Sequence, residues 1–134
     1  GSVAFSDHFP YRTRVFSPEG KLRVRFSGGS GSFKPPLRNQ EYDMYESQGG
    51  CVGVEAMPDG RLVNLVFSRR DSGSETCDYR FDMFRGDGQY LMTIPASSFN
   101  TSYVRAFSID QGGNFYIVCH EPYPCVRKYS IGIN

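Results

Sequence analysis

Apolar and polar residues alternate along much of this chain, in short runs separated by turns that contain glycine. In one run Leu22, Val24 and Phe26 alternate with Arg23 and Arg25. A period of two is typical of a β-strand that has one face in water. The pattern therefore predicts an all-β fold.

Pairs of such runs flank short turns and predict four β-hairpins. The clearest covers residues 79–94, where the two runs flank Arg85-Gly86-Asp87-Gly88. Glycine and aspartate suit this turn because a tight hairpin needs backbone geometry that other residues adopt reluctantly. The other three predicted hairpins turn at residues 17–20, 57–60 and 110–113. Further strands are expected at 3–9 and 125–131, a connecting loop at 27–39, and residues 41–47 are ambiguous.

The hairpins are of two alternating kinds, which indicates an internal repeat. The hairpin at Tyr79 repeats the one at Tyr11 after 68 positions, and Gly113 follows Gly60 after 53 positions. Residues 125–131 resemble the start of a third copy of the Tyr11 type. Equivalent positions predict shared roles in packing between repeats or in turns. These positions are Phe16, Phe84 and Tyr129 for packing, and Gly20, Gly60, Gly88 and Gly113 for turns.

Two hairpins of alternating kind make a four-stranded unit of roughly 40 to 50 residues, which is the period of a β-propeller blade. The chain is then a single propeller segment, 1–134. It contains a half blade at about 3–26, a full blade at about 53–94 and a partial blade at about 104–131.

The segments 15–21, 81–91 and 109–116 resemble the six-bladed β-propeller family with NHL-like repeats, as does the glycine-rich stretch 28–32. Many members of that family are exported proteins of Bacteroidetes-type bacteria. The resemblance implies an incomplete ring of two to three blades in an exported protein, periplasmic or at the cell surface. It also implies a non-catalytic binding or scaffold module for a protein, peptide or glycan.

Two alternatives remain open at this point. NHL-like propellers include lyases and hydrolases that use metals and axial histidine or aspartate residues, and the chain could be part of such an enzyme. The scarcity of histidine, only His8 and His120, weighs against that alternative. The other alternative is an unrelated closed β-barrel or sandwich.

An open arc of blades would expose two apolar blade faces and unpaired strand edges, both of which favour association. We therefore expect self-association through the open blade faces. The net charge of +1 gives no electrostatic argument for nucleic acid or an anionic membrane. No apolar stretch approaches the ~20 residues that a membrane span needs.

The four cysteines include one pair that could be bonded. Cys119 and Cys125 flank a short connection, so they could face each other across a hairpin and form a disulfide. The alternative is that all four cysteines are semi-buried thiols, because free cysteine packs as a small hydrophobe. No pair has the Cys-x-x-Cys spacing of zinc or redox sites.

The sequence predicts no catalytic residue, metal site or cofactor. Cys119-His120-Glu121 is the one cluster that mixes a nucleophile, a base and an acid, but neighbouring residues of a strand point to opposite faces. Asp59, Asp87 and Asp110 lie in predicted turns, and turn chemistry accounts for each of them.

Overall fold

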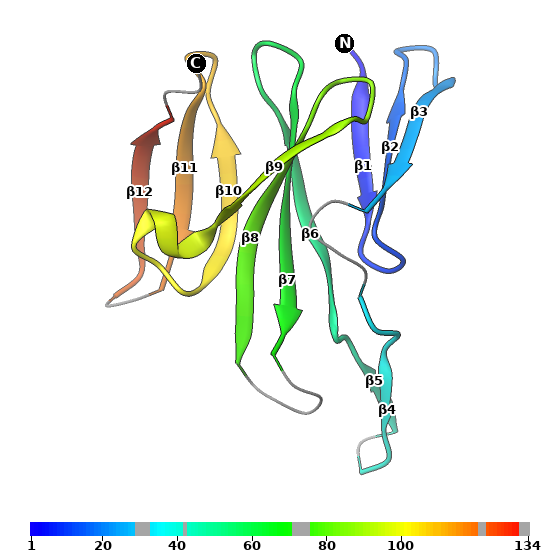
Figure 1. Cartoon of the computed structure of the whole chain (residues 1–134), viewed down its shortest axis with the longest axis vertical. Coiled ribbons are helices and arrows are strands. Elements are labelled where there is room, and N and C mark those ends of the chain that lie inside the picture. Colours follow the sequence, from blue (N-terminus) through cyan, green and yellow to red (C-terminus); the bar gives the residue numbers. More distant parts are fainter. Residues whose placement is uncertain (29–32, 42, 71–75, 121–122, 132–134) are drawn as a thin grey trace.

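The computed structural model describes residues 1–28, 33–41, 43–70, 76–120 and 123–131, and its strands form four antiparallel sheets (Figure 1). The prediction of an all-β fold is confirmed. No sheet among the described strands closes on itself, so the closed-barrel alternative is wrong. The glycine-rich stretch 28–32 lies mostly outside the described residues.

The central sheet has four strands in chain order, each paired with the next: β6 (Gly49–Ala56), β7 (Leu62–Arg69), β8 (Cys77–Phe84) and β9 (Tyr90–Pro95). It begins a few residues before the predicted boundary at 53. β9 crosses from the central sheet toward the C-terminal sheet and continues into a short 3-10 helix, η1 (Ala96–Phe99) (Figure 1). The sequence pattern gave no signal for this helix.

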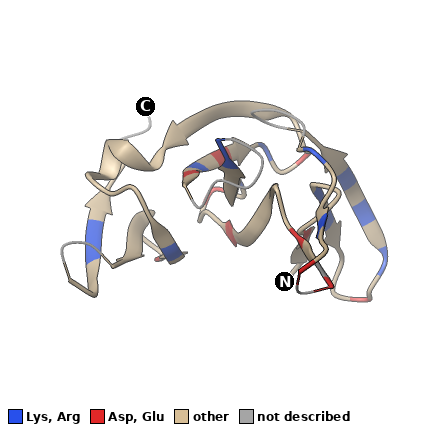
Figure 2. Ribbon diagram, turned by 90° about the horizontal axis from the view of Figure 1, so that it is seen from below, with Lys and Arg blue, Asp and Glu red and all other residues tan. Residues whose placement is uncertain are grey.

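Two three-stranded sheets flank the central one. The N-terminal sheet contains β1 (Val3–Asp7), β2 (Arg12–Phe16) and β3 (Leu22–Ser27). The C-terminal sheet contains β10 (Val104–Ile109), β11 (Asn114–Cys119) and β12 (Cys125–Ser130). β3 is an edge strand of the N-terminal sheet, and two arginines, Arg23 and Arg25, lie along it (Figure 2).

A small two-stranded sheet extends from the rest of the fold. β4 (Leu37–Asn39) pairs with β5 (Met44–Glu46) in the region that the sequence treated as loop and ambiguous segment. The loop prediction was wrong at 37–39. These three residues are too few for an alternating pattern to be recognised, so only their pairing with β5 identifies them as a strand.

The four hairpin turns share one backbone geometry. In each four-residue turn, the N–H of the first residue donates to the carbonyl of the residue that follows the turn, at 2.8 to 3.1 Å. The N–H of the fourth residue donates to the carbonyl of the first, at 2.9 to 3.0 Å. The fourth residue is always a glycine with φ between 77° and 89°, a region that costs other residues free energy. These four glycines are Gly20, Gly60, Gly88 and Gly113.

The repeat extends to irregularities of strand pairing. The register of β6 with β7 shifts between Cys51 and Gly53, and that of β10 with β11 shifts 53 positions later, between Val104 and Ala106. The β2–β3 pair shifts after Val15, and the β8–β9 pair shifts 68 positions later. A bulge places an extra residue in one strand and increases the local twist. The equivalent hairpins therefore share local backbone geometry as well as sequence.

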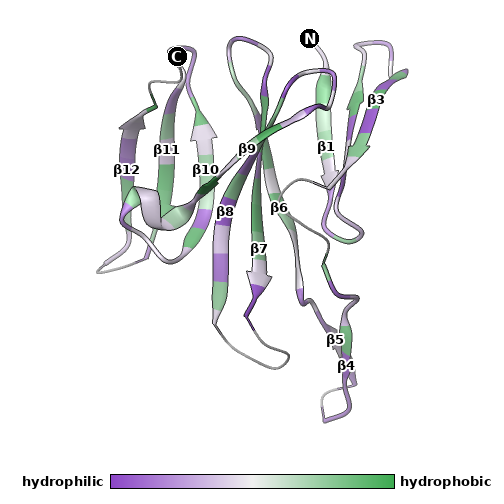
Figure 3. Cartoon of the chain, in the orientation of Figure 1, coloured by the Kyte–Doolittle hydropathy of each residue, from purple (hydrophilic) through white to green (hydrophobic). Residues whose placement is uncertain are grey.

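Both faces of the central sheet are buried around β7, which explains why its residues 62–67 are all apolar except Asn64 (Figure 3). One face packs against the C-terminal sheet, where Phe81 makes edge-to-face contacts with Phe107 and Phe115 at centroid distances of 5.2 and 6.0 Å. The other face packs against the N-terminal sheet, where Phe84 contacts Phe26 at 4.7 Å. Three sheets thus form successive layers with two separate apolar cores.

The predicted packing residues occupy different environments. Phe84 is buried in the core between the N-terminal and central sheets. Tyr129 packs against the other core, and its hydroxyl donates to the carbonyl of Phe99 at 2.6 Å. Phe16 is only half-buried, because its sheet is the first of the three layers and no described sheet covers its far side.

Cys119 and Cys125 face each other across a hairpin, as predicted, but no disulfide joins them. Cys119 and Cys125 are direct partners in the β11–β12 register. Both are free thiols in this structure, and so are Cys51 and Cys77. The Cys119 side chain is fully buried and directed at the carbonyl of Ile117, 3.7 Å away, so it satisfies its thiol locally rather than by bonding across the hairpin.

A buried polar network joins the N-terminal and central sheets. The amide nitrogen of Asn64 donates to the hydroxyl oxygens of Tyr11, at 2.9 Å, and Thr13, at 2.8 Å. The Tyr11 hydroxyl in turn donates to the carboxylate of Asp82, which is fully buried. Buried polar groups cost free energy unless they are hydrogen-bonded, so this network fixes how the two sheets face each other.

Candidate binding groove

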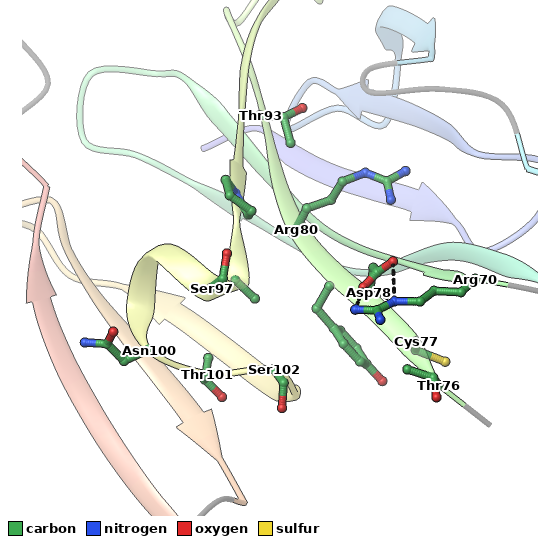
Figure 4. Close-up of a pocket in the computed structure, with 13 residues that line it drawn as sticks. Arg70, Thr76, Cys77, Asp78, Arg80, Thr93, Ser97, Asn100, Thr101 and Ser102 are labelled. Atoms are coloured by element: carbon green, nitrogen blue, oxygen red, sulfur yellow. Dashed lines mark hydrogen bonds and ion pairs between the residues drawn. The ribbon is translucent and has the colours of Figure 1, made fainter. Parts of the chain in front are cut away.

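A groove with a volume of about 590 Å³ lies beside the first half of β8 (Figure 4). Its walls come from β8, the end of β9, η1 and the connection from η1 to β10. Its position depends on β9, which leaves the central sheet and carries the chain to the C-terminal sheet. The residues that line it are Arg70, Thr76, Cys77, Asp78, Tyr79, Arg80, Thr93, Pro95, Ala96, Ser97, Asn100, Thr101 and Ser102.

One tyrosine contributes an aromatic surface to the groove. Tyr79 is half-buried, and its ring packs edge-on against Tyr103 at a centroid distance of 5.1 Å. Burial raises the pKa of Tyr79 to about 12, so its hydroxyl is neutral at physiological pH. The groove therefore contains a neutral aromatic ring that keeps a polar end.

The charged residues at the mouth of the groove are paired with each other. Both Nε and a terminal nitrogen of Arg70 donate to the Asp78 carboxylate, at 3.0 and 2.8 Å (Figure 4). This fork geometry is typical of arginine–carboxylate pairs. The Arg70 guanidinium lowers the pKa of Asp78, which keeps the carboxylate ionised. The pair presents donors and acceptors without a net charge.

Small polar side chains form most of the remaining wall. They come from the ends of β8 and β9 and from the connection after η1, where Asn100 has a left-handed backbone conformation. The Thr101 hydroxyl donates to the carbonyl of Tyr103 at 3.0 Å, which holds this connection in place. The polar wall residues are Thr76, Thr93, Ser97, Asn100, Thr101 and Ser102.

The inner wall of the groove connects to the buried polar network. The Thr93 hydroxyl donates to Asp82 at 2.7 Å. Arg80 donates to the Ser68 hydroxyl at 2.9 Å, and its guanidinium lies over the ring of Phe33 at 5.3 Å. Side chains held by such contacts keep their positions when a ligand arrives. This preorganisation reduces the entropic cost of binding.

The residues weighed for catalysis are not brought together. Cys119 points into the core, whereas His120 is exposed and contacts Tyr103 at a ring distance of 5.6 Å. Glu121 lies outside the described residues. His8 hydrogen-bonds to Ser47 and to the carbonyl of Cys51, on a different part of the molecule. Among the described residues, no three His, Cys, Asp or Glu side chains converge as a metal site would require.

The turn aspartates lie where turn chemistry places them. Asp110 accepts hydrogen bonds from the backbone of Gly112 and Asn114 and from the Tyr116 hydroxyl, at 2.9 to 3.0 Å. A hydrogen bond from the Asn114 side chain contributes most, and together with the bonds just named it lowers the pKa of Asp110 to about 2. Asp59 and Asp87 similarly accept from backbone N–H groups two residues further on.

The sequence reading missed the groove. Arg70, Thr76 and several residues between Ala96 and Ser102 line the groove, and the sequence pattern assigns no site to any of them. The one available signal was the density of Ser, Thr and Asn after Pro95. That signal is weak because the same residues are common in ordinary connections.

No protein-family model matches this chain, and the search of curated proteins found no relative. The likeness to NHL-like propellers therefore rests on the short motifs alone. In the part of the chain that the structure describes, no helix is long and apolar enough to cross a membrane.

Proposed function

We propose that this protein is a non-catalytic binding module that holds a glycan in the groove beside β8. The observation that carries the proposal is the composition of the groove wall. Six neutral side chains with hydroxyl or amide groups lie beside Tyr79, the Arg70–Asp78 ion pair and a second arginine, Arg80. Pockets that combine apolar surface with a few placed polar groups are the usual form of a ligand site.

The charge of the groove favours a neutral ligand. Arg70 is paired with Asp78, and Arg80 is engaged with Ser68 and lies 4.0 Å from Asp82. A sugar offers many hydroxyl groups to such a wall, and its apolar ring face can lie against Tyr79. An anionic ligand would have to displace Asp78 from a two-point contact with Arg70, which costs free energy.

We further propose that the sheets are blades of an incomplete β-propeller in an exported protein. The support is the four-stranded central sheet, the repeated turns and bulges, and the short motifs that resemble NHL-like repeats. Under this proposal the outer faces of the N-terminal and C-terminal sheets are open blade faces. Self-association through those faces would complete the ring. Light scattering at micromolar concentration tests for this self-association, and a stable monomer would contradict it.

Glycan binding is tested by screening the protein on a glycan array and titrating the best ligand by calorimetry. We expect Ser97→Ala with Ser102→Ala, and separately Asp78→Ala, to weaken binding about tenfold or more, since each removes groove hydrogen bonds worth roughly 1 kcal/mol or more. Arg23→Ala is the matched control, because Arg23 is an exposed residue on β3, far from the groove. Failure of every glycan, or equal affinity of groove and control variants, would contradict the proposal.

A further inference from the structure

Three aromatic rings form a row that leads out of the groove beside β8. The row begins with Tyr79, which lines the groove, and continues with Tyr103, whose ring centroid lies 5.1 Å away. His120 follows, with its ring centroid 5.6 Å from that of Tyr103. Tyr103 is 39% exposed and His120 is also exposed. These three residues, named the aromatic row below, therefore continue the groove wall onto the surface of the molecule.

The backbone that carries the outer part of the row is anchored by buried neighbours. Val104 and Cys119 are direct partners at one end of the C-terminal sheet, and they are 1% and 0% exposed. Tyr103 precedes Val104, and His120 follows Cys119, so the two rings lie next to each other. The bond from the Thr101 hydroxyl to the Tyr103 carbonyl holds the same segment. The positions of these rings are therefore fixed before a ligand arrives, which lowers the entropic cost of binding.

The outer rings of the row differ from the other aromatic rings between the central and C-terminal sheets. Four phenylalanines pack there and are no more than 9% exposed, namely Phe81, Phe99, Phe107 and Phe115. Core packing accounts for those four rings. Neither Tyr103 nor His120 belongs to the apolar core that the structure describes between these sheets. Aromatic side chains that keep a polar end in water are enriched at binding surfaces.

We propose that the aromatic row extends the groove and that the ligand is a linear, neutral oligosaccharide running from the groove over Tyr103 to His120. This inference rests on the proposed function of the groove. A pyranose ring has an apolar face of C–H groups, which can lie against an aromatic ring, and a rim of hydroxyl groups. The tyrosine hydroxyls and the imidazole nitrogens of His120 can hydrogen-bond to that rim.

The arrangement of the row favours a chain of sugars over a single sugar. Tyr103 stands between Tyr79 and His120, so only a ligand that extends beyond the groove contacts all three rings. Once one sugar is held in the groove, the next sugars of the same chain are kept at high effective concentration beside Tyr103 and His120. Affinity should therefore rise with the length of the oligosaccharide.

Calorimetric titration of the full chain with cello-, xylo- and manno-oligosaccharides, from disaccharide to hexasaccharide, tests the inference. We expect the affinity for at least one series to rise about tenfold or more with length. Tyr103→Ala and His120→Ala should each lower the ratio of hexasaccharide to disaccharide affinity about fivefold. Tyr45→Ala is the matched control and should not change this ratio, since Tyr45 is an exposed aromatic residue on the projecting strand β5 (Figure 1).

The outcomes separate a failure of this inference from a failure of the proposed function. Equal affinity for every length, or a ratio that the row variants leave unchanged while Asp78→Ala weakens binding, would overturn the inference and leave the groove as a glycan site. Binding of branched or acidic glycans alone would do the same. An absence of binding to any glycan, while circular dichroism shows a folded protein, would overturn both.

Discussion

The Tyr11 hydroxyl donates a hydrogen bond to the carboxylate of Asp82 at 3.2 Å, across the interface between the N-terminal and central sheets. The same hydroxyl accepts a bond from Asn64, so one oxygen links two central strands to the first sheet. All three side chains are buried. Apolar burial is non-directional, whereas the polar partners in this network are satisfied only when the two sheets face each other in one arrangement.

Tyr11→Phe should lower the free energy of unfolding by about 1 to 3 kcal/mol, because it removes one buried partner from each of Asn64 and Asp82. Urea denaturation followed by circular dichroism measures the change. Tyr45→Phe is the matched control, since Tyr45 is 71% exposed and its change should be nearly neutral. Equal effects of the two substitutions would show that the network does not stabilise the fold.

Stability should fall in alkaline solution, and Tyr11 should contribute to that fall. Burial, together with the negative charge of Asp82, raises the pKa of Tyr11 above the ordinary value of 10.0. Above about pH 10 the unfolded chain releases this proton while the folded chain keeps it, so the free energy of unfolding decreases as pH rises. Below pH 10 Tyr11 is protonated in both states, so the free energy of unfolding does not yet decrease because of this group.

Denaturation midpoints measured from pH 8 to 11 test this expectation. Tyr11→Phe should show a shallower alkaline decline than the wild-type protein, whereas Tyr45→Phe should follow the wild type. Part of the decline should persist in Tyr11→Phe, because burial also raises the pKa of Tyr79, to about 12. Identical slopes in all three proteins would contradict the assignment to Tyr11.

Gly88→Ala should destabilise the protein more than Gly113→Ala does. Both glycines have positive φ, 89° and 77°, and alanine in that region costs about 1 to 2 kcal/mol. A Cβ at Gly88 would also lie 2.6 Å from the ring of Phe26, whereas a Cβ at Gly113 would meet nothing within 4 Å. Thermal unfolding of the two variants gives the comparison, and equal destabilisation would show that Phe26 moves aside freely.

Oxidation should join Cys119 to Cys125 in preference to any other pair. They are direct partners across β11 and β12, where opposed residues have Cβ atoms about 4.5 to 5.5 Å apart, so a small approach of the strands reaches the about 3.5 to 4.5 Å of a disulfide. Exchange with oxidised glutathione would form the bond as both thiols lose their protons and the glutathione disulfide is reduced. Peptide mapping by mass spectrometry should find this crosslink, and Cys125→Ser should abolish it. Recovery of 119 and 125 as free thiols, or in other pairs, would refute the prediction.

The strands and turns were largely predictable because their signals are local. The alternation in β3, the buried run of β7 and the glycines at the turns each reflect neighbouring residues only. The repeat offsets of 53 and 68 also appear in the sequence, and the register shifts reproduce them. Backbone propensity and side-chain period are enough to fix such elements.

The tertiary structure alone decided which faces meet and where the groove lies. Asn64 and Asp82 appear as polar interruptions of apolar strands, and only the approach of Tyr11 from another sheet gives them partners. The groove depends on the path of β9, which brings residues 96–102 beside β8. Contacts between segments distant in sequence depend on how whole sheets stack, and short sequence patterns do not encode that stacking. The sequence by itself therefore determined the hairpins and their repetition, whereas packing decided the polar network and the groove.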